Sequence, residues 1–319
     1  MTQNELHVIF GTGPLAQAAM RALLKRGKSI KMVNRSGKRP ADAPAGVEIA
    51  AGDAYDAEFT HAVTKGAAVV YQCAQPEYHE WVPKFPPLQE AILSGAAANG
   101  AKLIVAENLY MYGDTNGKAL AEDLPYAAHT RKGKVRGEMA QALLEAHRRG
   151  QVRVAMARGS DFYGPGVLGS ALGERTIVPL LQGKPAEVTG ALDLPHTYTY
   201  INDFGEALAV LGEHDKALGR AWHVPNPPTL TQRELVTLFF KEAGLPPKFT
   251  VMGKLMLMVG GLFVPAAREM VEMAYEFEKP FQVNADQFIK TFGNLATPHE
   301  AAVKETVAWY RTFIKSHAA

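Results

Sequence analysis

The first half of the chain alternates short apolar segments with segments of helical periodicity, and this alternation constrains the fold more than any other feature. The segments that read as strands span residues 6–10, 29–33, 47–50, 67–73, 102–106 and 152–157, and those that read as helices span 14–26, 56–65, 86–99 and 130–149. Strands separated by helices of this length form a parallel sheet with right-handed crossovers. The strands are mostly continuous apolar runs, which is typical of strands covered on both faces. We therefore predict an α/β fold with a doubly wound parallel sheet.

The second half of the chain has a different pattern. Gly and Pro become frequent after Gly166, which indicates loops with short helices. The segments that follow read as a strand at 197–201, a helix at 203–212, a last strand of the main sheet at 221–224 and a mainly helical remainder at 231–315. We predict a first domain of residues 1–166, to which 197–226 return, and a smaller, mainly helical C-terminal region of residues 167–196 and 227–319.

Composition and charge exclude several classes of protein. A length of 319 residues corresponds to roughly two ordinary domains, and 34 basic against 32 acidic residues give no electrostatic basis for binding nucleic acid or an anionic membrane. The single cysteine, Cys73, excludes an internal disulfide framework, and the histidines are not at metal-ligand spacing, so we expect no metal site. The apolar run 255–267 is shorter than the ~20 residues that a helix needs to cross a bilayer. The polar N-terminus has no recognisable export signal, and we expect a cytoplasmic protein.

A glycine-rich turn follows the first expected strand and opens the first expected helix. Residues 11–16 read Gly-Thr-Gly-Pro-Leu-Ala, which is a G-x-G-x-x-A pattern. The first glycine permits a tight turn, the second lets the backbone approach a pyrophosphate, and the alanine lets the helix pack closely on the strand. Free amides at the start of the helix then face the phosphates. This pattern predicts a Rossmann-like dinucleotide site formed by Gly11, Thr12, Gly13, Pro14 and Leu15.

The end of the second expected strand bears on which dinucleotide is bound. Sites for NAD commonly place a carboxylate there to bind the ribose 2′-hydroxyl, whereas this chain has Asn34, Arg35 and Ser36. A guanidinium pairs well with a 2′-phosphate, and a hydroxyl can add a hydrogen bond. We therefore predict that the cofactor is NADP and that NAD is less favoured.

Several segments together resemble the extended short-chain dehydrogenase/reductase family, also called the NAD-dependent epimerase/dehydratase superfamily, and the resemblance covers nearly the whole chain. The segments that carry it are 11–16, 52–54 (Gly-Asp-Ala), 71–74 (Tyr-Gln-Cys-Ala), 111–113 (Met-Tyr-Gly), 157–166 (Ala-Arg-Gly-Ser-Asp-Phe-Tyr-Gly-Pro-Gly) and 198–203 (Tyr-Thr-Tyr-Ile-Asn-Asp). The resemblance implies that the cofactor lies beside Asp53, Ala54, Cys73, Ala74 and Ser160. It also implies a homodimer formed through helices 86–99 and 130–149, and a C-terminal region that binds a small-molecule substrate.

The resemblance also implies an acid/base site, and the chain departs from the family there. The family uses Ser or Thr, Tyr, and a Lys four residues after the Tyr. Lys134, followed by Glu138, matches the lysine, which implies that Lys134 also binds the nicotinamide ribose. Thr130 occupies the tyrosine position, and Asn108 occupies the serine position. An aliphatic hydroxyl does not titrate near neutral pH, so Thr130 cannot replace a phenol unaided.

Three alternatives remain open at this point. Lys134 is itself the acid/base, a phenol reaches the site from elsewhere, or the protein binds the nucleotide without chemistry. The phenols that we consider are Tyr110, Tyr112, Tyr126 and Tyr163.

The interpretation that we favour is an NADP(H)-dependent oxidoreductase that transfers a hydride to a small carbonyl or conjugated apolar substrate. Its candidate catalytic residues are Lys134, Asn108, Tyr110 and Thr130. The alternatives are a non-catalytic NADP-binding regulator and, because the tyrosine is replaced, less favourably a sugar-nucleotide epimerase or dehydratase.

Overall fold

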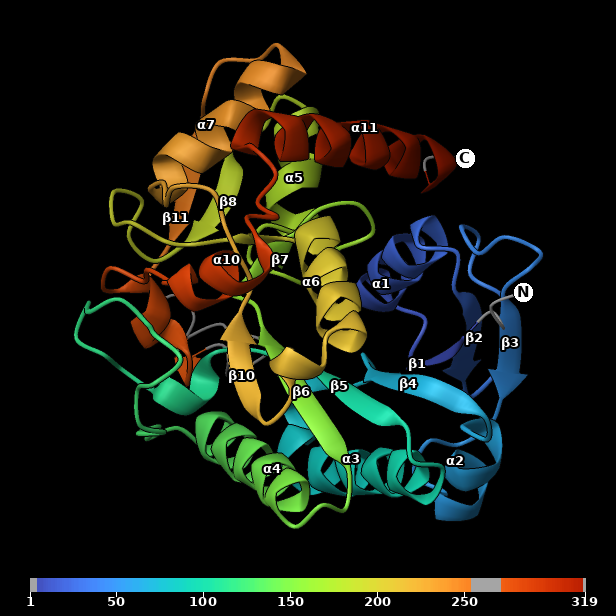
Figure 1. The fold of residues 1–319 in the computed structure, drawn as a ribbon. Coiled ribbons are helices and arrows are strands. Elements are labelled where there is room, and N and C mark those ends of the chain that lie inside the picture. The colour runs from blue at the N-terminus through green and yellow to red at the C-terminus, as the bar shows by residue number, and fades with distance from the viewer. Residues whose placement is uncertain (1–4, 254–270, 318–319) are drawn as a thin grey trace. The chain divides into compact units, whose positions relative to one another are not determined.

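A seven-stranded sheet forms the core of the first of two compact units in the computed structural model, which describes residues 5–253 and 271–317 (Figure 1). This unit contains the described residues up to Met111, together with Arg131–Gly159 and Phe204–Val224. All neighbouring strands are parallel, in the order β10 (Arg220–His223), β6 (Arg153–Arg158), β5 (Lys102–Glu107), β4 (Ala67–Gln72), β1 (Leu6–Phe10), β2 (Ser29–Asn34) and β3 (Glu48–Ala51). The prediction of a doubly wound parallel sheet is confirmed, and the last strand expected at 221–224 is β10, at Arg220–His223.

Helices cover both faces of this sheet. One face carries α1 (Pro14–Lys25) and α6 (Ile201–Glu213), and the other carries α2 (Ala57–Val63), α3 (Trp81–Ala98) and α4 (Arg131–Arg148) (Figure 1). The helices α1 and α6 approach so closely that a Cβ atom on Gly205 would lie 2.4 Å from the carbonyl carbon of Ala18. Both faces of the sheet are therefore buried, which explains the apolar strands.

The second unit contains Tyr112–Thr130, Ser160–Asp203 and the described residues from Pro225 onward. It has two small parallel sheets, in which β8 (Ala186–Thr189) pairs with β11 (Phe249–Met252) and β7 (Phe162–Tyr163) pairs with β9 (Thr199–Tyr200). Its helices are α5 (Glu174–Leu181), α7 (Gln232–Ala243), α10 (Asp286–Phe292) and α11 (His299–His317). The helices α7 and α11 pack against each other and carry much of this unit's apolar core.

Three predicted elements differ from the observed ones. The helix expected at 86–99 begins at Trp81, because Trp81 and Phe85 are buried and their packing outweighs the cost of Pro86 and Pro87 inside the helix. The strand expected at 197–201 spans only Thr199–Tyr200, because α6 already begins at Ile201. The strands β8 and β11 were not predicted, since each has four residues and depends on pairing with a distant segment.

The apolar run 255–267 lies outside the described residues. Among the helices that the structure describes, none combines the length and the apolar character that crossing a bilayer requires.

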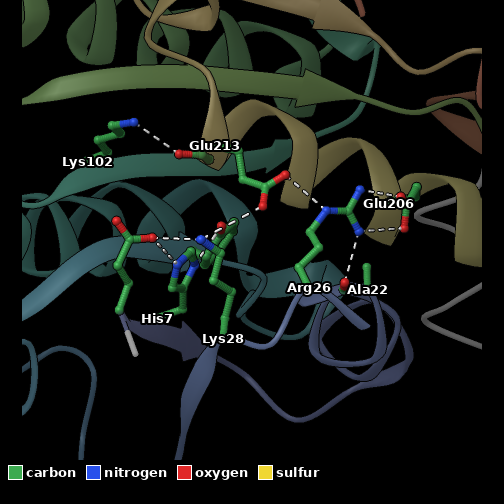
Figure 2. Close-up of polar contacts among 10 residues, drawn as sticks. His7, Ala22, Arg26, Lys28, Lys102, Glu206 and Glu213 are labelled. Atoms are coloured by element: carbon green, nitrogen blue, oxygen red, sulfur yellow. Dashed lines mark hydrogen bonds and ion pairs between the residues drawn. The ribbon is translucent and has the colours of Figure 1, made fainter. Parts of the chain in front are cut away.

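A charged network ties the last turn of α6 to the amino end of the sheet and to the end of α1 (Figure 2). The Nε atom of Arg26 donates a hydrogen bond of 3.0 Å to Glu213, and its Nη1 atom donates one of 3.1 Å to Glu206. The Nζ atom of Lys28 lies 2.7 Å from the carboxylate of Glu5 and 3.9 Å from the carboxylate of Glu213. Because α6 leads from the second unit into the first, this network fixes where the returning chain packs on the sheet.

A buried histidine lies beside this network, at the start of β1. His7 is almost fully buried, and its Nδ1 atom lies 3.0 Å from the hydroxyl of Tyr71. Burial, and then the charge of Lys28, lower the pKa of His7 from 6.5 to about 4. Between these two pH values the unfolded chain binds a proton at this position and the folded chain does not. The contribution of His7 to stability is therefore complete above pH 6.5 and is lost as the pH falls toward 4.

We predict that replacing His7 with Gln removes this part of the acid sensitivity. Between pH 7 and pH 4.5, the free energy of unfolding of the native protein should fall more steeply than that of H7Q, by at most ~1.4 kcal/mol per pH unit. Chemical denaturation at several pH values measures both slopes. Parallel slopes for the two proteins would contradict the burial of a neutral imidazole.

Candidate functional site

The turn after β1 lies against the end of β4, and this contact requires a glycine. Gly11 has a φ of +111°, a conformation that side chains disfavour. A Cβ atom on Gly11 would lie 3.0 Å from the amide nitrogen of Ala74 and 3.2 Å from the carbonyl carbon of Cys73. The amide of Gly11 donates to the carbonyl of Val33 at 2.9 Å. The turn is thus held between β2 and β4.

The start of α1 fits a bound pyrophosphate. Gly13 caps the helix without a side-chain hydrogen bond, and Pro14 occupies its first turn. A Cβ atom on Gly13 would meet no protein atom within 4 Å, so the space beside the turn is open to a ligand. The first-turn amides have no acceptor within the helix, and the first turn contains no acidic residue that would repel a phosphate. The side chain of Gln17 donates to the carbonyl of Thr12 at 2.9 Å and stabilises the turn.

The loop after β2 presents a basic side chain. The amide group of Asn34 donates to the carbonyl of Lys38 at 2.9 Å, and the hydroxyl of Ser36 donates to the Asn34 side chain at 3.2 Å. These bonds order the loop from within. Arg35 is exposed, and among the described residues it has no hydrogen-bond or ion-pair partner. Its guanidinium is available for an anion at the end of β2.

The predicted residues after β3 and β4 lie at the same edge of the sheet. Asp53 is exposed, and its carboxylate accepts a hydrogen bond of 3.1 Å from the amide of Tyr55. The amide of Cys73 donates to the carbonyl of Phe10 at 3.0 Å. Burial raises the pKa of the Cys73 thiol to about 12, which disfavours the reactive thiolate form. These positions border the point between β4 and β1 where the strand order reverses, which is where doubly wound sheets bind ligands.

The candidate acid/base residues of the first unit follow β5 and lie on α4. The side chain of Asn108 accepts a hydrogen bond of 3.3 Å from the amide of Tyr110, which starts the 3-10 helix η2 (Tyr110–Tyr112). Lys134 on α4 is exposed and has no hydrogen-bond or ion-pair partner within the described part of the chain. Lys132, two residues earlier, is buried. The helix therefore presents these two lysines to different surroundings, and they do not form one solvated basic face.

Other predicted residues belong to the second unit. Thr130 is buried directly before α4. The Ser160 hydroxyl donates to the carbonyl of Thr197 at 2.6 Å, and the Ser160 amide donates to the hydroxyl of Thr199 at 2.9 Å. Tyr112 packs against Tyr126, with ring centroids 5.9 Å apart.

A further phenol considered from the sequence, Tyr163, is also in the second unit. It is buried, and this burial raises its pKa well above the usual range. A raised pKa makes Tyr163 harder to ionise, which does not favour an acid/base role.

Sequence reasoning missed a buried ion cluster at the carboxyl ends of β5 and β6. Glu107 and Arg158 are paired residues on these strands, and the Arg158 Nε atom donates to the Glu107 carboxylate at 2.9 Å. Arg136 from α4 adds a second contact to Glu107 at 3.4 Å. All three side chains are buried, and burial lowers the pKa of Arg136. The signal in the sequence was a charged residue at the end of each of two apolar strands.

Comparisons with known proteins agree with this architecture. Residues 8–224 match the model of the NAD dependent epimerase/dehydratase family. A search of curated proteins gave no significant match. A similar solved structure is an epimerase from Methanothermobacter thermautotrophicus, with 14% identity and a TM-score of 0.82, covering 98% of this chain and 94% of that one. The dTDP-glucose 4,6-dehydratase DesIV from Streptomyces venezuelae, with NAD and TYD bound, has 15% identity and a TM-score of 0.79, covering 98% of each chain. The UDP-N-acetylglucosamine 4-epimerase from Bacillus cereus has 13% identity and a TM-score of 0.75, covering 96% of each chain.

At these identities the solved structures show a shared fold, whereas the family match spans more than half of the chain. The chain belongs to the NAD dependent epimerase/dehydratase family.

Proposed function

We propose that this protein is an NADP(H)-dependent oxidoreductase that transfers a hydride to a small carbonyl or conjugated apolar substrate. The observation that carries the proposal is the open, amide-lined turn between β1 and α1, next to a loop after β2 that offers Arg35 in place of a carboxylate. Family membership supports a nicotinamide cofactor, and the DesIV structure contains NAD. The choice of NADP over NAD rests on the chemistry of the β2 loop alone.

The residues that would hold the cofactor follow from the order of the strands. The pyrophosphate would lie on the first-turn amides of α1, and the adenosine half would lie over the ends of β2 and β3, between Arg35, Ser36 and Asp53. The nicotinamide half would then extend toward the ends of β4 and β5, where Ala74 and Asn108 lie. Lys134 would bind the nicotinamide ribose.

The side chains near the end of β5 can handle the substrate oxygen. When bound, NADPH supplies the hydride. The Asn108 amide group can donate a hydrogen bond to the oxygen that gains charge, which stabilises it in the transition state. Two groups of the first unit can protonate this oxygen: Lys134, directly or through a water molecule or the ribose, and Tyr110. Thr130 cannot do so unaided, because its hydroxyl does not ionise near neutral pH.

A second function is supported by the same replacements. A protein that binds NADP without catalysis needs the nucleotide turn and no acid/base phenol, and Thr130 and Asn108 stand where the family has its tyrosine and serine. Tight NADPH binding with no oxidation across a panel of apolar carbonyl and enone compounds would favour this regulator. Sugar-nucleotide epimerisation or dehydration is disfavoured, because these reactions begin with a substrate oxidation for which the family uses the missing tyrosine.

We predict that Arg35→Asp reverses the cofactor preference. The substitution removes the partner of the 2′-phosphate and supplies an acceptor for the ribose hydroxyl. The Kd for NADPH should rise by about tenfold or more, which corresponds to roughly 1.4 kcal/mol, while the Kd for NADH stays the same or falls. Fluorescence titration of both nucleotides measures the two constants, and Lys65→Asp, at an exposed position in the turn after α2, is the matched control. Equal losses for both nucleotides would contradict the assignment of NADP.

We also predict that Lys134→Ala nearly abolishes turnover. Loss of the ammonium removes a charge that favours proton transfer at the substrate oxygen, and such groups contribute roughly 10²–10⁴-fold. NADPH oxidation with a carbonyl compound that the native protein reduces is the assay. Lys65→Ala, which removes another exposed lysine, should retain full activity. Native-like turnover of the Lys134 variant would remove this residue from the mechanism.

A further inference from the structure

The loop after β2 is ordered by a chain of hydrogen bonds among its own residues. The Nδ2 atom of Asn34 donates to the carbonyl of Lys38 at 2.9 Å, and the Oδ1 atom accepts from the Ser36 hydroxyl at 3.2 Å. The Ser36 oxygen in turn accepts from the amide of Lys38 at 3.2 Å. The carboxamide of Asn34 therefore closes a ring of hydrogen bonds that fixes Lys38 relative to the end of β2.

Contacts with neighbouring segments of the first unit hold this loop in place. The amide of Gly52, directly after β3, donates to the carbonyl of Asn34 at 3.1 Å. Gly37 has a φ of +67°, and a Cβ atom there would lie 2.9 Å from the Cβ atom of Ala51. The Nδ2 atom of Asn34 also lies 3.4 Å from the Thr12 hydroxyl. The loop is thus seated on the end of β3, and Asn34 links it to the phosphate turn.

The internal bonds of the loop determine which of its groups can bind an anion. The Ser36 hydroxyl has one proton and gives it to Asn34. The Arg39 guanidinium donates to a backbone carbonyl at 2.8 Å. The ammonium of Lys38 is exposed and, like the guanidinium of Arg35, has no hydrogen-bond or ion-pair partner among the residues that the structure describes. Arg35 and Lys38 are therefore the cations whose charged groups this loop leaves unpaired.

The charge of Arg35 reaches the loop after β3. Burial raises the pKa of the Tyr55 phenol, and the positive charges of Lys84 and Arg35 oppose this rise. The amide of Tyr55 donates to the Asp53 carboxylate at 3.1 Å, so Asp53 belongs to the same segment. Arg35 thus acts at the edge of the sheet over which the adenosine half of the cofactor would lie.

We infer that Lys38 is a second specificity-determining residue for the 2′-phosphate of NADP, alongside Arg35, and that Asn34 is the residue that positions it. A phosphate monoester carries a charge of roughly −1.5 to −2 at neutral pH, which two unpaired cations match better than one. This inference rests on the proposed function, because it specifies how the loop after β2 recognises the phosphate that distinguishes NADP from NAD. It also gives Asn34 a different role from direct cofactor binding, since Asn34 acts through Lys38.

The ³¹P NMR signal of the 2′-phosphate tests this inference in the full chain saturated with NADP⁺. The pKa of a free phosphate monoester is about 6, and nearby cations should lower the pKa of the bound group, because they favour the dianion. Lys38→Met should raise the pKa of the bound phosphate toward the free value, and Lys38→Arg should restore the native value. Lys65→Met, which removes an exposed lysine in the turn after α2, should have no effect. Identical titrations in the native protein and Lys38→Met would overturn the inference.

Fluorescence titration with NADPH and NADH gives an independent measure. Lys38→Met should raise the Kd for NADPH by about tenfold, as expected for the loss of one charged hydrogen bond, and should leave the Kd for NADH unchanged. Lys38→Arg should recover most of the lost affinity. Equal losses for both nucleotides in Lys38→Met would show that Lys38 supports the loop and does not recognise the phosphate, which would also overturn the inference.

Asn34→Ala tests the positioning role, because it keeps both cations and removes the hydrogen bonds that hold Lys38. The ratio of the Kd values for NADH and NADPH should fall. If Asn34 acts through Lys38, Asn34→Ala should lower this ratio little further in a chain that already carries Lys38→Met, since residues that act as one unit are not additive. Fully additive losses in the double variant would contradict the positioning role.

Failure of the proposed function would appear differently. The native protein would then show no preference for NADPH over NADH, and this result would overturn both the choice of cofactor and the role of Lys38. A native protein that prefers NADPH, with Lys38→Met indistinguishable from it in both titrations, would leave the cofactor assignment intact and overturn this inference alone.

Discussion

The contact between the backbone of Gly11 and the Cys73–Ala74 segment determines where this protein can bind a ligand. It brings the end of β1 against the end of β4, at the point where the strand order reverses, and it directs the free amides of α1 toward open space. Any side chain at position 11 would have to adopt a disfavoured φ and would approach the Ala74 nitrogen at 3.0 Å.

Buried ion pairs hold the carboxyl ends of β5 and β6 together. Glu107 lies between Arg158 and Arg136, and all three are buried. Removing Glu107 would leave two buried guanidinium groups without this carboxylate, and breaking a buried ion pair in this way costs about 3–5 kcal/mol. The cluster therefore holds α4 against the end of β5, directly before Asn108.

Local sequence patterns predicted the elements of the sheet and the phosphate turn, because both depend on neighbouring residues. Continuous apolar runs identified the seven strands, and Gly11, Gly13 and Ala16 identified the turn. The start of α3 was missed because the burial of Trp81 and Phe85 overrides the preference for starting a helix at proline. The Glu107 cluster was missed for a different reason. It joins residues 29 or more positions apart, which only the pairing of β5 with β6 and the packing of α4 bring together.

The central claim is that the turn at residues 11–15 binds a dinucleotide pyrophosphate. Backbone amide NMR of the full chain during titration with NADP⁺ tests this most directly. The account predicts saturable shifts centred on Gly11, Thr12, Gly13 and Leu15, with further shifts at Arg35, Ser36 and Ala74. Absence of any saturable shift at the turn, while the protein remains folded, would contradict it.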